Sequence, residues 1–258
     1  MYKFLIVLML TATSLAVAET PEEKGFAIAL ETDNRDKGWQ DSSAVMKMVL
    51  RNRHGQESVR QIRVVNLEME GDGDKGLTVF DEPRDIKGTA FLSYSHALVA
   101  DEQWIYLPAL KRVKRISSSN KSGPFMGSEF AYEDISSFEI PKYNYLYLRD
   151  EVLDGIDCFV LELRPQYQYS GYTKSYVWVD KVEYRNQKVE YYDRKGSLLK
   201  VQRFTDYQLY LNQYWRAHTM TMDNKQNGKS TTLYWTNFKF KTGLTSADFK
   251  KNDLKRQR

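Results

Sequence analysis

A β-hairpin pattern stands out in residues 176–201, YVWVDKVEYRNQKVEYYDRKGSLLKV. Apolar and polar side chains alternate through Lys188–Tyr192 and again through Leu198–Phe204, and the turn Asp193-Arg194-Lys195-Gly196 separates the two runs. A period of two on either side of a short, glycine-containing turn is typical of paired antiparallel strands. This stretch therefore predicts a protein built mainly from β-sheet.

Strand patterns with tight-turn signals recur at short intervals from Ala44 to Phe240, and we count about eleven strands. Nearly every connection is short, so neighbouring strands are expected to be antiparallel and to form one continuous sheet. A sheet of this size curls and closes partly into a barrel, and a barrel wider than about eight strands leaves interior space. The expected fold class is mainly β with a few helices.

Residues 1–18 have the layout of a cleavable signal peptide. Lys3 precedes an apolar run, and Ala16-Val17-Ala18 supplies the small residues that a signal peptidase requires, so we expect cleavage after Ala18. A retained membrane anchor is the alternative, but the apolar core is far shorter than the roughly 20 residues of a bilayer span. The mature chain is therefore expected outside the cytoplasm.

The remaining residues, 19–258, are expected to form a single domain that begins with a helix. Thr20-Pro21-Glu22-Glu23 combines an N-cap, a proline at the first helical position and a capping box, and Gly38 is placed to end the helix. The single cysteine, Cys158, cannot form an internal disulfide and lies in an apolar run. We expect it to be a buried thiol.

The sequence offers little sign of nucleic-acid binding or catalysis. The formal net charge is only +4, and no HExxH or GxSxG motif is present. We therefore expect no nucleic acid, enzyme activity, metal or cofactor. For the acidic cluster Glu129, Glu133 and Asp134 we expect a solvated helix face; a glycosidase pair acting on envelope glycans is the alternative.

Aromatic side chains are abundant, with 18 Tyr, 12 Phe and 5 Trp. Several recur at period two within predicted strands, which places each set on one face of the sheet. Such sets wall an apolar pocket or fill an ordinary core, and the pattern leaves both open. The sets are Trp104 with Tyr106, Tyr176 with Trp178, and Tyr234 with Phe238 and Phe240.

Four bases crowd the strand that follows Trp104: Lys111, Arg112, Lys114 and Arg115. Lysine and arginine commonly protect an edge strand from pairing with another chain. The same bases could form a docking rim for anionic lipid headgroups or an acidic partner. The charge pattern alone favours neither reading.

Residues 104–135, WIYLPALKRVKRISSSNKSGPFMGSEFAYEDI, strongly resemble the signature stretch of the outer membrane lipoprotein-sorting proteins, a LolA-like group of periplasmic proteins. Residues 176–201 look like the strand pair of the wider lipoprotein-carrier superfamily, with WVDK, a later tyrosine-aspartate and the turn glycine Gly196. The resemblance covers essentially the whole mature chain. It implies a periplasmic, half-open antiparallel β-barrel whose mouth is covered by short helices, as in LolA and LolB.

The resemblance also implies a function. In the lipoprotein carrier, an apolar cavity holds acyl chains during transfer from the inner to the outer membrane. Members of this group are often associated with transporters of the resistance-nodulation-division (RND) type, so we expect an inner-membrane RND-type partner and transient membrane contact. This chain departs from the carrier by a loop-and-helix insert, Ser117–Ile135, which leaves the cargo open between a lipoprotein and another lipid.

We expect residues 117–135 to be the lid of the cavity, because a polar loop leads there into apolar side chains that must cover something. A fixed plug is the alternative. A structural adaptor that docks onto an envelope transporter is the alternative function. The residues expected in the cavity or lid are Trp104, Tyr106, Leu107, Phe125, Met126, Phe130, Tyr132, Tyr176 and Trp178, and those of the basic docking rim are Lys111, Arg112, Lys114 and Arg115.

Overall fold

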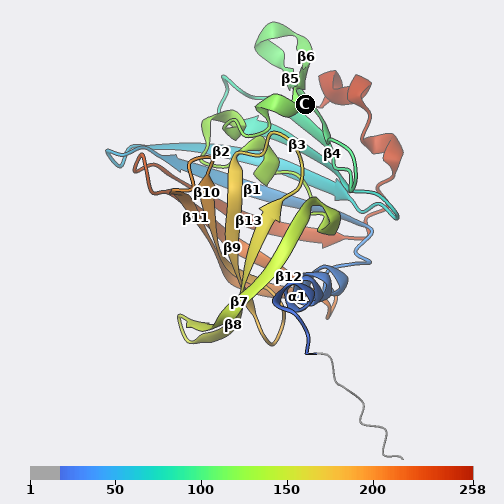
Figure 1. Ribbon diagram of the computed structural model, residues 1–258. Helices are drawn as coiled ribbons and strands as arrows, with labels where there is room; N and C mark the ends of the chain where they lie inside the picture. Colours follow the sequence, from blue (N-terminus) through green and yellow to red (C-terminus); the bar gives the residue numbers. More distant parts are fainter. Residues whose placement is uncertain (1–17, 258) are drawn as a thin grey trace, which may run out of the picture.

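The computed structural model describes residues 18–257, which fold into one strongly curved antiparallel sheet preceded by a helix (Figure 1). The sheet has thirteen strands, not about eleven, in the order β6-β5-β4-β3-β2-β1-β13-β12-β11-β10-β9-β8-β7. The elements are α1 (Pro21–Arg35), β1 (Asp41–Arg51), β2 (Glu57–Leu67), β3 (Lys75–Glu82), β4 (Ala90–Tyr94), β5 (Glu102–Leu107), β6 (Arg112–Ile116), β7 (Tyr143–Leu153), β8 (Ile156–Pro165), β9 (Tyr172–Asp180), β10 (Asn186–Asp193), β11 (Leu198–Tyr210), β12 (Tyr214–Asn224) and β13 (Ser230–Phe240).

The strand order describes one open sheet with two edges. β1 pairs with β2 on one side and with β13 on the other, so the first and last strands lie together in the middle of the sheet. The two edge strands, β6 and β7, are consecutive in sequence. Residues 117–142, which we call the crossing segment, connect them across the opening. The architecture is the expected half-open barrel.

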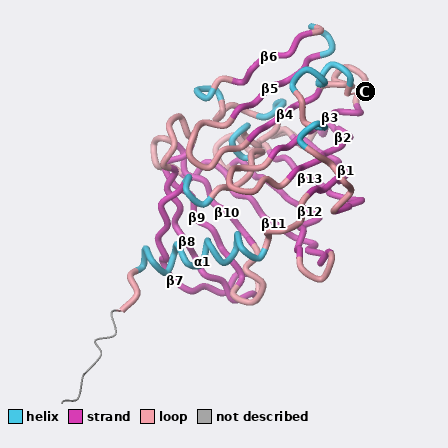
Figure 2. The backbone as a smooth tube through the Cα atoms, turned by 90° about the vertical axis from the view of Figure 1, so that its right-hand side faces the viewer, coloured by secondary structure: helices cyan, strands magenta, loops and turns pink. Residues whose placement is uncertain are grey.

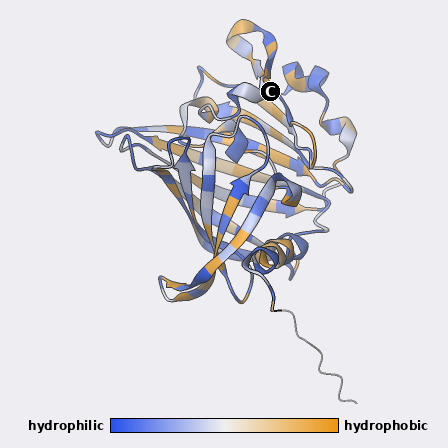
Figure 3. Ribbon diagram, in the orientation of Figure 1, coloured by the Kyte–Doolittle hydropathy of each residue, from blue (hydrophilic) through white to orange (hydrophobic). Residues whose placement is uncertain are grey.

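Successive side chains of each strand point to opposite faces of the sheet, and apolar and polar residues alternate along many strands in Figure 3. Apolar clusters nevertheless form on both faces. We call inner the face that packs against α1 and the crossing segment. On it, β1 contributes Met46 and Met48, which are opposite Ile62 and Arg60 of β2. The outer face of β2–β5 is covered by the C-terminal segment, through Phe249 and Leu254. The sheet is therefore buried on both faces over part of its width.

The N-terminal helix forms as predicted. The Thr20 hydroxyl accepts from the Glu23 amide and the Glu23 carboxylate accepts from the Thr20 amide, which completes the capping box. Gly38, with φ of 93°, turns the chain toward β1. α1 packs along β7 on the inner face (Figure 2), and a Cβ on Gly25 would lie 2.7 Å from the Tyr147 nitrogen, so glycine permits this close approach.

Two other sequence expectations have different outcomes. Cys158 is fully buried, as expected, and burial raises the pKa of its thiol to about 11. The helix expected within Ser117–Ile135 does not form; that stretch contains three short 3₁₀ turns at 118–120, 125–127 and 132–134. The expected signal peptide lies almost entirely outside the described residues. No helix within residues 18–257 is long and apolar enough to cross a membrane.

Candidate functional site

The crossing segment fills part of the barrel interior with its own side chains. Phe125 is 0% and Phe130 is 2% exposed, and both belong to the inner-face core. The Phe125 ring centroid lies 5.2 Å from that of Phe91, 5.5 Å from Tyr132 and 6.0 Å from Phe80. Met126 is partly exposed and adopts a left-handed conformation, with φ of 50°. This burial favours a fixed plug over a free lid.

Buried polar contacts attach the crossing segment to the sheet. The Lys200 ammonium of β11 lies 2.6 Å from the Asp134 carboxylate, which also accepts from the Tyr172 hydroxyl at 2.7 Å. The Glu133 carboxylate accepts from Tyr167, Ser170 and the Gly171 amide at 2.8–3.0 Å. Burial raises the pKa of Glu133.

These contacts correct the expectation of a solvated acidic helix face. Glu133 and Asp134 are engaged by the sheet and by the loop that precedes β9, and Glu129 accepts from the Asn224 amide at 2.7 Å. A carboxylate whose oxygens are held by structural donors is poorly placed to act as an acid or a nucleophile. Within residues 18–257, no group of three or more metal-ligating side chains is present.

Near the C-terminal end of the crossing segment lie two further acidic side chains, Asp74 and Glu139. The Ser137 hydroxyl donates to Asp74 at 3.3 Å, and the Ser137 amide donates to Ser95 at 2.9 Å. Burial raises the pKa of Asp74 to about 6 and that of the nearby Glu139 to about 7. Both carboxyls therefore change charge in the neutral to weakly acidic range.

A second part of the inner face is covered by α1. Ile28 and Ala29 of the helix pack with Tyr145, Leu161 and Val177 of the sheet. Tyr191 of β10 packs against both this cluster and the one beneath the crossing segment. The helix and the crossing segment thus cover neighbouring parts of the same apolar surface.

Between the two covers, the inner face keeps large apolar side chains that are only partly buried. Phe204 of β11 is directly opposite Met220 of β12, and Trp235 of β13 is opposite Met46 of β1. Met220 and Trp235 pack at the margin of the crossing-segment cluster, and Phe204 at the margin of the α1 cluster. We call Phe204, Met220, Trp235 and Phe238 the trough.

A β-bulge adds Phe238 to the trough. The pairing of β13 with β1 shifts by one residue between Ser43 and Val45, where Asn237 has φ of 56°. The shift places Phe238 on the same face as Trp235, with ring centroids 5.9 Å apart and nearly parallel. Tyr234 lies on the outer face, beside Lys47. The expectation that Tyr234, Phe238 and Phe240 share one face is therefore wrong.

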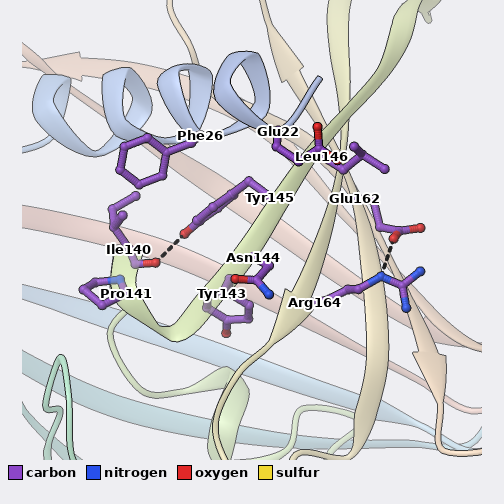
Figure 4. A pocket seen from close by; sticks show the side chains of 10 residues that line it. All are labelled: Glu22, Phe26, Ile140, Pro141, Tyr143, Asn144, Tyr145, Leu146, Glu162 and Arg164. Atoms are coloured by element: carbon purple, nitrogen blue, oxygen red, sulfur yellow. Dashed lines mark hydrogen bonds and ion pairs between the residues drawn. The ribbon is translucent and has the colours of Figure 1, made fainter. Parts of the chain in front are cut away.

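The structure also has two open pockets, one of which includes Phe238 of the trough. One of about 530 Å³ lies at the β7 edge, where α1 meets the end of the crossing segment (Figure 4). The exposed Phe26 ring stands 6.0 Å from Tyr145, whose hydroxyl donates to the Ile140 carbonyl at 2.9 Å. The other, of about 710 Å³, lies at the β13 bulge and is lined in part by Ala44, Val64 and Phe238.

The structure brings together only some of the residues expected in the cavity or lid. Leu107 packs on the inner face with the crossing-segment residues Phe125, Met126, Phe130 and Tyr132. Trp104 and Tyr106 lie on the outer face under the C-terminal segment. Tyr176 and Trp178 are also on the outer face, packed with Cys158 and Val160. These four aromatic residues do not share the interior with Phe125.

Sequence reasoning missed most of the trough. Phe204, Met220 and Trp235 lie within predicted strands, but no local motif separates them from core residues. The four predicted rim bases, Lys111, Arg112, Lys114 and Arg115, are all exposed on or next to the edge strand β6.

Comparison with known proteins identifies this architecture as the LolA-like class of half-open barrels. A LolA superfamily protein from Nitrosomonas europaea has the same fold, with a TM-score of 0.72 at 22% identity over 88% of this chain and 98% of that one. A family model whose description is "Uncharacterized protein" matches residues 72–256. Comparison with curated proteins gives no match.

Two solved structures are much more similar. A domain described as an outer membrane lipoprotein-sorting protein, from Vibrio parahaemolyticus, is 61% identical over 91% of this chain and 100% of that one, with a TM-score of 0.90. A DUF1329 family protein from Desulfovibrio piger is 32% identical over 91% and 99%, with a TM-score of 0.86. The chain belongs to the outer membrane lipoprotein-sorting protein family.

Proposed function

We propose that the protein is a periplasmic carrier that shields the acyl chain of a lipoprotein, or of another lipid, during transfer between the inner and the outer membrane. The observation that carries the proposal is the trough, where Phe204, Met220 and Trp235 remain partly exposed between two covers. Family membership and the LolA-like fold support the same function. The proposal includes export by residues 1–18, and it requires no catalytic residue.

The energetics of acyl-chain transfer favour such a surface. Exposing an acyl chain to water costs about 0.8 kcal/mol per methylene, so a chain of around 16 carbons costs on the order of 12 kcal/mol. The two pockets, of about 530 and 710 Å³, fall within the size range of small-molecule sites. Moving a chain from bilayer to trough changes apolar exposure little, so direction must come from an energised donor or a tighter acceptor. We propose an RND-type transporter as that donor.

Quenching by a brominated fatty acid tests the trough directly, because bromine quenches indole fluorescence only at close range. We expect brominated stearate to quench the wild-type protein, and Trp235→Phe to remove most of that quenching. Trp104→Phe, on the outer face, is the matched control and should keep it. Equal quenching in both variants would place the lipid elsewhere.

A structural adaptor is the second candidate, and the interior filling by Phe125 and Phe130 favours it. A carrier should hold bound lipid, whereas a structural adaptor should not. Organic extraction of the protein purified from its native envelope, followed by mass spectrometry, should release lipid in stoichiometric amount from a carrier. Lipid-free protein that also fails to take up brominated stearate would support the adaptor.

A further inference from the structure

Two segments far apart in sequence gather basic side chains at one end of the molecule. Residues 103–120 contain four bases and no acid, and residues 249–257 contain four bases and one acid. Together they carry +7, while the whole chain carries +4, so the rest of the chain has a net charge of −3. The protein is therefore strongly polarised in charge.

The fold places these two segments side by side. The C-terminal 3₁₀ turn, Lys251–Arg256, packs against β4, β5 and β6. Figures 1 and 2 both show the β5–β6 hairpin and the C-terminal end together, on the opposite side of the molecule from α1. Lys251 lies 5.6 Å from the Trp104 ring, and Trp104 is the cross-strand neighbour of Arg115.

Few acids neutralise these bases. Among residues 18–257, Arg115 pairs with Glu102 at 3.6 Å and Arg256 with Asp253 at 3.4 Å, and no ion pair forms at the other six bases. All eight are exposed: Lys111, Arg112, Lys114, Arg115, Lys250, Lys251, Lys255 and Arg256. Like charges held together repel one another, and an anionic surface relieves that repulsion.

The hairpin tip is apolar. Pro108–Leu110 form a single 3₁₀ turn between β5 and β6, and the Leu110 side chain is 51% exposed. Leu107, beside the tip, and Ile116, at the base of the hairpin, pack on the inner face against the same cluster as Met126 of the crossing segment. An apolar tip within a ring of bases matches the boundary between lipid headgroups and acyl chains better than it matches an acidic protein.

We propose that the β5–β6 hairpin and the C-terminal segment form a docking surface for a bilayer that exposes anionic phospholipid headgroups. The bases contact the phosphates, and Leu110 enters the interface. Because Leu107 and Ile116 continue this surface to the crossing segment, docking brings that end of the barrel interior next to the membrane. The inference does not depend on lipid being carried in the trough.

Vesicle co-sedimentation of the purified mature chain tests the proposal. At low salt we expect binding to phosphatidylcholine vesicles that contain phosphatidylglycerol, little binding to phosphatidylcholine alone, and release at high salt. Each base near such a surface contributes about 1 kcal/mol, so Lys111→Glu/Arg112→Glu/Lys114→Glu should weaken binding at least about tenfold. Arg53→Glu/Lys225→Glu/Lys229→Glu is the matched control, because these exposed bases lie at other hairpin tips.

The apolar contribution has its own variant pair. Leu110→Ser should weaken binding severalfold without changing its salt dependence, while Leu211→Ser, also exposed at a hairpin tip, should have no effect. Equal losses in the two triple variants, equal binding to neutral and anionic vesicles, or no vesicle binding at all would each overturn the proposal. In the last case, retention on a polyglutamate column would assign the basic surface to an acidic protein partner instead.

Discussion

Lys200 and Asp134 form an ion pair across the barrel interior, with 2.6 Å between the ammonium and the carboxylate and both side chains 4% exposed. Lys200 belongs to β11 and Asp134 to the crossing segment, so the pair joins the sheet to the segment that bridges its two edges. The Lys200 ammonium also donates to the Glu129 carbonyl at 2.9 Å. A buried charge of this kind depends on its partner.

Replacing Lys200 by methionine should therefore be severely destabilising, because Asp134 would remain buried and unpaired. We expect Lys200→Met to lower the free energy of unfolding by about 3–5 kcal/mol in urea titrations. Lys225→Met is the control; its pair with Asp223 is 3.8 Å long and well exposed, and its loss should cost less than about 1 kcal/mol. A small effect of Lys200→Met would show that the pair does not hold the crossing segment.

Phe125 should behave as a core residue and not as a mobile gate. It is fully buried against Phe80, Phe91 and Tyr132, so Phe125→Ala should cost about 3–5 kcal/mol of stability and lower the melting temperature. The control is Phe138→Ala, since Phe138 is 46% exposed and stacks only against Tyr143 in the described structure. An unchanged melting temperature with weaker lipid retention would restore the lid hypothesis.

A charge in the trough should weaken lipid binding with little effect on folding. Met220 is partly exposed, so a lysine at this position can extend its ammonium toward water. We expect Met220→Lys to weaken binding of a fluorescent fatty acid at least about tenfold, because desolvating the new charge opposes the acyl chain. Tyr234→Lys, on the outer face of the adjacent strand, should bind the probe like the wild type. Normal binding by Met220→Lys would exclude the trough as the site.

The raised pKa values of Asp74, about 6, and Glu139, about 7, predict a pH-dependent stability. Burial is the main cause of both shifts, and repulsion from Glu68 and Asp36 raises the pKa of Asp74 further. At Glu139, repulsion from Asp74, Asp33 and Asp101 raises the pKa, and attraction to Lys142 partly offsets that repulsion. In the unfolded chain both carboxyls titrate near about 4. The folded state therefore retains protons that the unfolded state loses, and this contribution, complete below pH of about 4, disappears as the pH rises through 6 and 7.

Asp74→Asn/Glu139→Gln removes that dependence. Each pKa unit corresponds to about 1.4 kcal/mol, and solvent screening at these incompletely buried carboxyls lowers the sum of the two shifts. Relative to wild type, the double variant should therefore gain at least about 2 kcal/mol of unfolding free energy between pH of about 4 and 7.5, as measured by urea titration at several pH values. Asp72→Asn is the contrast, because a hydrogen bond from His96 lowers the pKa of Asp72 to about 2. Its difference from wild type should change only below pH of about 4, and a parallel profile for both variants would contradict the assignment.

Much of the fold could be predicted because local sequence and global structure agree. The capping box at Thr20 and the alternation through Lys188–Tyr192 each specify their element without distant contacts. The conformation of the crossing segment could not, since Phe125 and Phe130 follow no period and are buried by strands far away in sequence. A short apolar stretch without periodicity does not reveal its secondary structure.

The site was harder to predict because the sequence of a strand does not show which of its two faces lies in the barrel interior. β5 is apolar on both sides; its inner side packs on the crossing segment and its outer side, with Trp104, on the C-terminal segment. Alternation alone cannot say which side is the interior. The bulge at Asn237 could not be predicted from the sequence either, since asparagine tolerates a left-handed conformation but does not require one.

The strand order also determines where the half-open barrel can widen. Every pair of neighbouring strands in the sheet is joined by a ladder of backbone hydrogen bonds. The two edge strands, β6 and β7, are joined only by the crossing segment, residues 117–142. Widening the barrel there breaks no ladder, whereas widening it anywhere else does. A bulkier bound lipid should therefore be accommodated by displacement of the crossing segment, and the ion pair between Lys200 and Asp134 should limit that displacement.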